Sequence, residues 1–295
     1  MDYLLHIAIL TAMFATLSLS LNLVAGYTGL LSVAHAAFYG IGAYTAALMA
    51  QELHSQFLLN LVAAGALGGL IGVIVGVPLL RVRDDYFVMA TFAFQIIALG
   101  IMNNWTAVTG GPLGMSGVPR PVILGWTVST QWGYLGLAGG LCLGVYFVMR
   151  RMVRSPFGRV LKAIREDEVF AQSLGKNVAH VKILTFAIGA GFAGMVGAMY
   201  AQYSSFIDPS SFTVMESIFI LSIVIIGGAG SLRGPIVGAV VLVTLPEILR
   251  FVGLPSSVAA NVRQMLYGGL LVVFMLWRPQ GLLGEYAFEK GSATG

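Results

Sequence analysis

The residues that could carry chemistry in this chain are isolated polar side chains within long apolar runs. His35 follows Ser32 in a stretch of small residues, and Glu216 begins an apolar segment. HExxH, GxSxG and Walker sequences are absent, and GGAGSLRG at 227–234 is not a phosphate-binding loop. The single cysteine, Cys142, excludes a disulfide within the chain and a metal cluster built on cysteine. We therefore expect no catalytic residue, no metal site and no cofactor.

Polar residues within apolar segments can instead line a transport pathway, because inside a membrane they usually face the interior of a helix bundle or a water-filled cavity. As candidates for lining a pathway through the bundle we take Asn22, Ser32, His35, Thr91, Gln95, Asn103 and Glu216. For His35 the competing interpretation is a hydrogen-bonded packing residue. Glu216 and Glu247 allow two interpretations. They could be interfacial anchors or members of an ion pair, or they could couple transport to a proton or cation gradient.

The composition places these residues in a membrane protein. Of 295 residues, 58% are hydrophobic and 9% are charged, whereas soluble domains carry roughly 25% charged residues. The mean hydropathy is +0.88. The 38 glycines are spread through apolar segments, as in closely packed membrane helices. Although the formal charge is +4, the basic residues lie at the ends of apolar segments, which argues against nucleic-acid binding.

Spanning about 30 Å of hydrocarbon takes roughly 20 helical residues. The sequence predicts an all-α, polytopic transmembrane helical bundle with about nine spans (eight to ten), forming a single transmembrane domain over 1–295. The first segment has no Lys or Arg before it, so we expect a retained helix rather than a signal peptide. Segments two, four and eight contain glycine or polar interruptions and are candidates for broken or re-entrant helices. The nine segments are 3–25, 30–50, 58–80, 86–103, 131–150, 183–203, 212–229, 235–252 and 263–277.

Basic residues indicate the topology, because Lys and Arg are enriched in cytoplasmic loops. An outside amino terminus and a cytoplasmic carboxyl terminus leave only Arg120, Arg250 and Arg263 outside. Two loops are long: an outer one at 104–130, which we expect to dip toward the membrane or cover an entrance, and an inner one at 150–182. The stretches 26–44 and 227–242 share a glycine turn before a glycine-punctuated helix, which leaves an internal repeat open. The thirteen cytoplasmic residues are Arg81, Arg83, Arg150, Arg151, Arg154, Arg159, Lys162, Arg165, Lys176, Lys182, Arg233, Arg278 and Lys290.

The inner loop predicts two short helices. Ser155 suits an N-cap and Pro156 the first helical position, and a second helix over 168–174 stops at Gly175. The first helix is amphipathic and could lie on lipid headgroups or dock into a groove on a soluble partner. Its acidic run at 166–168 favours a protein partner. The apolar stripe consists of Phe157, Val160, Leu161 and Ile164, and the other faces carry Arg159, Lys162, Arg165 and Glu166.

Five separated blocks in order give the chain a resemblance to the permease subunits of branched-chain amino acid ABC importers, of the LivM rather than the LivH type. They are GYTGLLSVAHAAFYGIGAY (26–44), RVRDDYFVMATFAF (81–94), TGGPLGMSGVP (109–119), SPFGRVLKAIREDEVFAQSLG (155–175) and SFIDPSSFTVMESIFILSIVIIGGAGSLRGPIVGA (205–239). The resemblance covers nearly the whole chain.

This resemblance implies a multi-pass subunit of the bacterial inner (plasma) membrane that imports branched-chain or related amino acids by alternating access. It implies a LivH-like permease partner, two LivG/LivF-like ATPases that hydrolyse the ATP, and a periplasmic or extracellular binding protein. An ion-coupled secondary amino acid transporter is the alternative. Ala171 and Gly175 keep the Ala-to-Gly spacing of the importer coupling loop, whereas Glu168 lies one place early for the strict EAA pattern. Coupling to the ATPases is thereby assigned to Ser155, Pro156, Phe157, Gly158, Arg159, Val160, Leu161, Lys162, Ile164, Arg165, Glu166, Ala171, Leu174 and Gly175.

Overall fold

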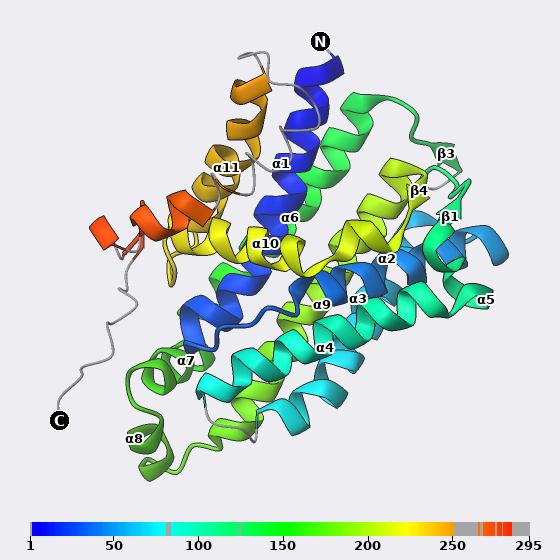
Figure 1. The fold of residues 1–295 in the computed structure, drawn as a ribbon. Helices are drawn as coiled ribbons and strands as arrows, with labels where there is room; N and C mark the ends of the chain where they lie inside the picture. The colour runs from blue at the N-terminus through cyan, green and yellow to red at the C-terminus, as the bar shows by residue number, and fades with distance from the viewer. Residues whose placement is uncertain are drawn as a thin grey trace.

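The computed structural model describes residues 2–80, 84–123, 125–250, 265, 268–274, 276–278 and 280–284, and most of these are helical (Figure 1). The strands are only two residues long. In chain order the elements are α1 (Asp2–Leu21), the π-helical turn η1 (Asn22–Gly26), α2 (His35–Glu52), α3 (Phe57–Leu79), α4 (Asp84–Asn104), α5 (Thr106–Thr109), η2 (Gly111–Leu113), β1 (Met115–Ser116), β2 (Val122–Ile123), β3 (Trp126–Thr127), α6 (Gln131–Arg154), α7 (Pro156–Glu166), α8 (Glu168–Ser173), α9 (Val178–Ser204), β4 (Phe206–Ile207), η3 (Pro209–Phe212), α10 (Val214–Gly227) and α11 (Gly234–Arg250).

The predicted polytopic helical bundle is confirmed. The first eight predicted segments coincide with α1, α2, α3, α4, α6, α9, α10 and α11. The ninth, 263–277, lies partly outside the described residues, and its described part is helical. The number of spans and their orientation stay predictions. Within the described residues, five helices are long and apolar enough to cross a membrane: Asp2–Gly26, Phe57–Leu79, Tyr86–Asn104, Gln131–Arg154 and Val178–Ser204.

The interruptions lie elsewhere than the sequence predicted, except in the second segment. There, α2 begins at His35 after the non-helical stretch 29–34. The predicted breaks within 86–103 and 235–250 are wrong, because α4 and α11 run without interruption; residues 251–252 lie outside the described residues, and re-entrance of either helix stays a prediction. Glycines in these helices serve packing or face open space: a Cβ on Gly238 would lie 2.3 Å from the Ile223 carbonyl of α10. The break falls at 228–233, between α10 and α11, where Gly228 and Gly230 have φ of +112° and +80°.

Small residues set the spacing of α2, α3 and α9. A Cβ on Gly42 of α2 would lie 2.1 Å from the Gly194 carbonyl of α9, and one on Gly197 would lie 2.0 Å from the Tyr39 carbonyl. A Cβ on Gly68 of α3 would lie 2.9 Å from the Ala190 carbonyl. The three backbones therefore touch directly, which is how membrane helices gain packing without a hydrophobic driving force.

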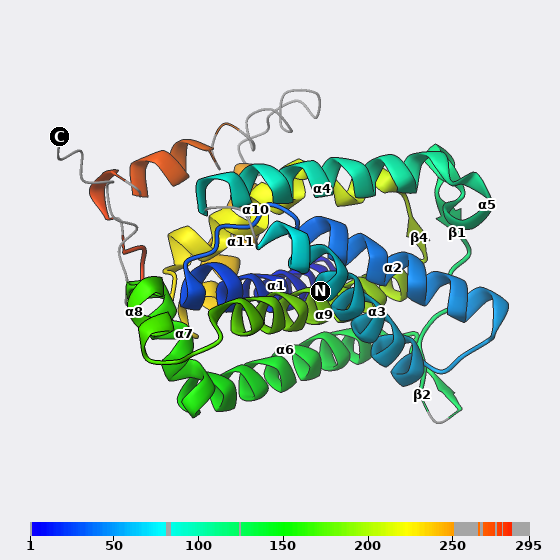
Figure 2. The same cartoon turned by 90° about the horizontal axis from the view of Figure 1, so that it is seen from below.

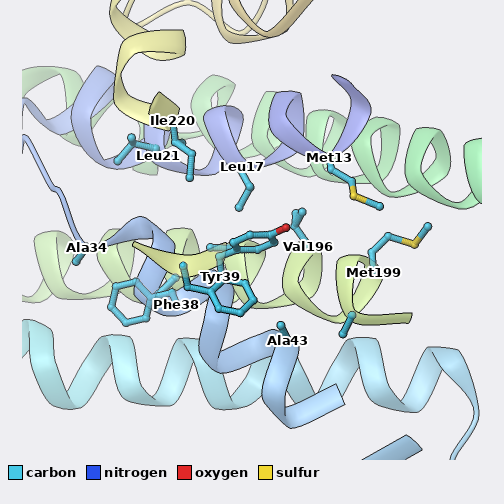
Figure 3. Close-up of a cluster of buried hydrophobic side chains, with 14 of the residues drawn as sticks. Met13, Leu17, Leu21, Ala34, Phe38, Tyr39, Ala43, Val196, Met199 and Ile220 are labelled. Atoms are coloured by element: carbon cyan, nitrogen blue, oxygen red, sulfur yellow. The ribbon is translucent and has the colours of Figure 1, made fainter. Parts of the chain in front are cut away.

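The main apolar core lies where α1, α2, α9 and α10 meet (Figure 3). Leu17 of α1, Val196 of α9 and Ile220 of α10 are buried there. Tyr39 of α2 packs edge-on against Phe212, with ring centroids 5.1 Å apart. This core holds the α2 and α10 starts against α1, which matters for the polar contacts described below.

The two long loops lie at opposite ends of the bundle (Figure 2). At one end, β1 pairs antiparallel with β4 (Met115 opposite Ile207), and β2 pairs with β3 (Val122 opposite Thr127). At the other end lie α7 and α8. The predicted outer loop is thus a folded platform joined to the end of α9, and its position over an entrance stays a prediction.

Candidate functional site

The segment connecting α6 to α9 is a compact helical unit. Pro156 occupies the first turn of α7, as predicted, and Ser155 is at the N-cap position. The Ser155 hydroxyl nevertheless donates to the Met152 carbonyl at 2.6 Å and does not cap α7. A Cβ on Gly158 would lie 2.0 Å from the Val153 carbonyl, so α7 folds back tightly on the end of α6.

The apolar stripe of α7 faces the protein itself. Leu161 is fully buried among Tyr27 and Met149, at the base of the bundle. Ile164 packs on Ala171 of α8 and Val178 of α9. The two interpretations offered for this stripe, burial in lipid or in a partner's groove, are therefore both wrong for Leu161 and Ile164. Periodicity located the stripe correctly, but the bundle covers it.

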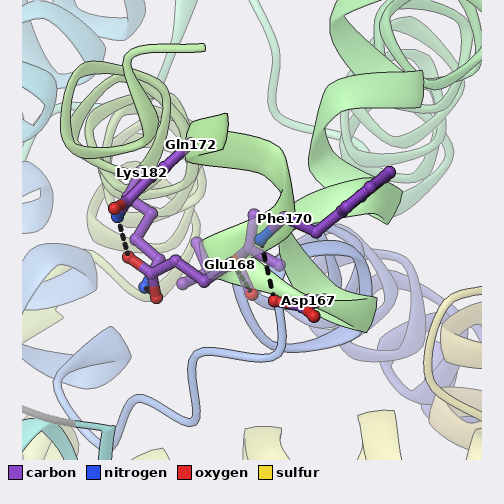
Figure 4. Close-up of polar contacts among 7 residues, drawn as sticks. Asp167, Glu168, Phe170, Gln172 and Lys182 are labelled. Atoms are coloured by element: carbon purple, nitrogen blue, oxygen red, sulfur yellow. Dashed lines mark hydrogen bonds and ion pairs between the residues drawn. The ribbon is translucent and has the colours of Figure 1, made fainter. Parts of the chain in front are cut away.

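Polar contacts hold α8 in place (Figure 4). The Asp167 carboxylate accepts from the Phe170 amide at 2.9 Å and caps the helix. Glu168 forms an ion pair with the largely buried Lys182 of α9. Gly175, with φ of +74°, ends the segment as the sequence predicted. The ion pair therefore ties α8 directly to α9.

The large apolar side chains that this unit exposes lie on α8 and at its C-terminal end. Val169, Phe170 and Leu174 are 74%, 59% and 60% exposed, and we call these three residues the α8 face. Only Leu174 was among the sequence candidates. Val169 and Phe170 carry a recognisable signal, because two large apolar residues directly follow the acidic run 166–168 without an i, i+3 partner within their own helix. Exposed apolar residues clustered at a polar end of the molecule mark an interaction surface.

Arg165 links α7 to the connection between α1 and α2, because its guanidinium donates to the Gly26 carbonyl. Four residues earlier, Asn22 holds the break between α10 and α11. Its amide nitrogen donates to the Ser231 carbonyl at 2.8 Å, and its carbonyl oxygen accepts from the Gly230 amide at 2.9 Å. One side chain thus satisfies two backbone groups of a buried non-helical turn.

A second group of predicted pathway residues binds the start of α2. Gln95 accepts from the Ala37 amide at 2.8 Å and donates to the Phe212 carbonyl at 2.8 Å. Thr91 accepts from the Val33 amide at 3.2 Å. His35 Nε2 lies 2.8 Å from the Ser20 hydroxyl, in agreement with the packing interpretation of this histidine.

The remaining pathway candidates occupy three different settings. Ser32 is buried beside the Ala34 amide. Asn103 is half-buried near the end of α4 and donates to the Leu99 carbonyl of its own helix. Glu216 lines a cavity of about 270 Å³ between α1, α2, α9 and α10, together with Tyr39 and Tyr200. A carboxylate, two phenols and the Ser211 hydroxyl in a cavity otherwise lined by apolar residues of α1 can hold a small polar solute. Pathway lining by the seven residues stays a prediction.

No group of three or more His, Cys, Asp or Glu in the described part of the chain could hold a metal ion. The site geometry is that of a helical membrane transport component: a bundle with a polar buried network and a folded unit presenting an apolar face at one end.

Comparison with known proteins identifies the family. The model of the family described as branched-chain amino acid transport system / permease component matches residues 3–275. The chain is 38% identical to the high-affinity branched-chain amino acid transport system permease protein LivM of Escherichia coli K12, over 98% of this chain and 73% of that protein. The LivM of Salmonella typhimurium LT2 is similar to the same extent. No solved structure matches the chain.

A second type of relative also matches. The LivH permease protein of the same E. coli strain is 27% identical over 94% of this chain and 93% of that protein. That transport system therefore includes two permease proteins related to this chain. The chain belongs to the family of branched-chain amino acid transport permease components, and it is a multi-pass membrane permease subunit.

Proposed function

We propose that the chain is the LivM-type subunit of an ATP-driven importer in the bacterial inner (plasma) membrane. It pairs with a LivH-like permease and moves branched-chain or related amino acids received from a binding protein at the platform end. Two LivG/LivF-like ATPases bind at the α7–α8 end and carry out all catalysis. Its relatives' names support the substrate class and the pairing, and the α8 face supports the position of the ATPases.

The α8 face is the observation that carries this proposal. Three large apolar side chains are exposed beside the acidic run 166–168, where a lipid-bound helix would instead place basic residues. A helix whose apolar side chains enter a groove on a soluble protein needs this arrangement. The buried apolar stripe of α7 packs against the bundle and transmits the force that the ATPases exert on α8.

Three contacts then convey the movement of α8 and α7 into the bundle. The Glu168–Lys182 ion pair pulls on α9. Leu161 presses on Met149 of α6. Arg165 holds Gly26, the last residue of the π-helical turn η1 that begins at Asn22, and Asn22 binds the break between α10 and α11. Closure of the ATPases on ATP would thus move the non-helical stretches 29–34 and 228–233. The helices next to these stretches can reorient during alternating access.

Amino acid uptake into cells tests this proposal. Val169→Asp places a charge on the α8 face, so uptake should fall to background while the permease still reaches the membrane. Ala179→Asp is the matched control, because Ala179 is exposed in the first turn of α9 at the same end of the molecule. Normal uptake by Val169→Asp would contradict the coupling assignment.

The cavity beside Glu216 is the observation that favours the alternative, an ion-coupled secondary transporter. Reconstitution of this chain alone in vesicles separates the two functions. Uptake driven by a proton or sodium gradient, without ATPases, would replace the importer proposal. No uptake by the chain alone, and ATP-dependent uptake once the LivH-like permease, the ATPases and the binding protein are added, would support it.

A further inference from the structure

A cationic cavity of about 610 Å³ lies at the α7 end of α6. Arg150 and Arg154 come from α6, Lys162 from α7 and Arg233 from the turn between α10 and α11. None of the described residues that line this cavity is acidic. Basic residues at a cytoplasmic membrane boundary are common, but here they converge from three separate elements on one hollow.

An apolar groove of about 640 Å³ lies between α1, α6 and α11. Leu4 and Ala8 line it from α1, Gly139 and Leu143 from α6, and Ile236 from α11. Its lining is almost wholly apolar. The groove is therefore suited to a hydrocarbon chain and offers nothing to a charged group.

The groove and the cavity follow one another along the same elements. On α6, Gly139 and Leu143 line the groove, and Tyr146 and Arg150 line the cavity, at i, i+4, i+7 and i+11 on one helix face. Arg233 in the cavity is three residues before Ile236 in the groove. The distance along α6 from Gly139 to Arg150 is about 16 Å, about half the thickness of the hydrocarbon core.

We propose that the cavity and the groove, which lie along one face of α6, together bind one anionic phospholipid of the inner leaflet. Its phosphate lies among Arg150, Arg154 and Arg233, and an acyl chain lies in the groove past Leu143 toward Gly139. The basic cavity at one end and the apolar groove beyond it match an amphiphile with a charged headgroup and a hydrocarbon chain. Arginine binds phosphate through its planar pair of N–H donors, so an anionic headgroup is preferred over a zwitterionic one.

Native mass spectrometry of the purified transporter complex tests the proposal with two lipids of identical chains, phosphatidylglycerol and phosphatidylcholine. We expect one phosphatidylglycerol to be retained preferentially. Arg150→Gln/Arg154→Gln should weaken that binding about thirtyfold, the contribution of two basic side chains near an anionic surface. Arg159→Gln/Lys176→Gln removes the same charge from exposed positions at the same end and should leave it unchanged.

The groove has its own pair of variants. A Cβ on Gly139 or on Gly140 would meet no heavy atom within 4 Å, so a larger side chain fits at either position. Gly139→Phe fills the groove and should weaken retention, whereas Gly140→Phe lies outside the groove lining and should not. Equal retention of the two lipids, or of phosphatidylglycerol by the arginine variants and the wild type, would overturn the proposal. Glycerol phosphate binding as tightly as the lipid would instead establish a free-anion site. Retention of the lipid by this subunit alone but not by the complex would assign the groove to the partner permease and overturn the proposal.

Discussion

Truncation of Phe170 should weaken ATPase binding by a predictable amount. A phenylalanine side chain presents about 200 Å² of mostly apolar surface. Since Phe170 is 59% exposed, about 120 Å² remains for a partner to cover. At about 25 cal/mol per Å², full coverage contributes about 3 kcal/mol, an upper bound of about a hundredfold in affinity. Phe170→Ala should therefore weaken the association of the ATPases between tenfold and a hundredfold.

The assay is the binding of purified ATPase subunits to the permease complex in lipid nanodiscs. Phe147→Ala is the matched control, because Phe147 on α6 is 58% exposed but lies along a membrane span. Both variants should retain the wild-type unfolding profile. Equal ATPase affinity for Phe170→Ala and the wild type would refute the assignment of the α8 face, and an equal loss with Phe147→Ala would show that the effect is not specific to it.

Three further predictions concern the bundle. Asn22→Ala should lower the free energy of unfolding by about 2–4 kcal/mol in detergent titrations, because it leaves the Gly230 amide and Ser231 carbonyl unsatisfied. An unchanged free energy of unfolding would contradict the stabilising role of these two hydrogen bonds. Gly42→Ala should destabilise the bundle by more than about 1 kcal/mol, since its methyl group would overlap the α9 backbone, whereas Gly100→Ala meets open space and should be neutral or stabilising. Glu216→Gln should leave ATP-driven uptake insensitive to an imposed proton gradient, as in the wild type; a gradient-dependent uptake abolished by this change would favour the ion-coupled alternative.

Hydropathy predicted the helices well because a span needs a fixed length of apolar residues. Composition cannot tell which polar or glycine residue breaks a helix, however. The sequence made Gln95 a candidate for lining the pathway, whereas its amide binds the backbone of α2 and η3, more than fifty residues away in each direction. The break between α10 and α11 depends on Asn22, whose partners lie more than two hundred residues along the chain.

Periodicity identified the amphipathic helix at 156–166 and its apolar stripe. It could not reveal what covers that stripe, because Leu161 is buried by residues from α6 and the α1–α2 connection. The exposed α8 face was missed for the converse reason. Val169 and Phe170 are adjacent in sequence and show no helical period, so the position after the acidic run singles them out, but only the fold shows that they are exposed.

Site-specific crosslinking tests the ATPase contact most directly, and Cys142 is the single cysteine to be replaced beforehand. In a Cys142→Ser background, Phe170→Cys should crosslink to an ATPase subunit in membranes containing the assembled transporter, with a yield that changes on addition of nucleotide. Leu113→Cys, exposed at the platform end, should give no such product. Absence of an ATPase crosslink from Phe170→Cys, or equal yields from both positions, would contradict the account.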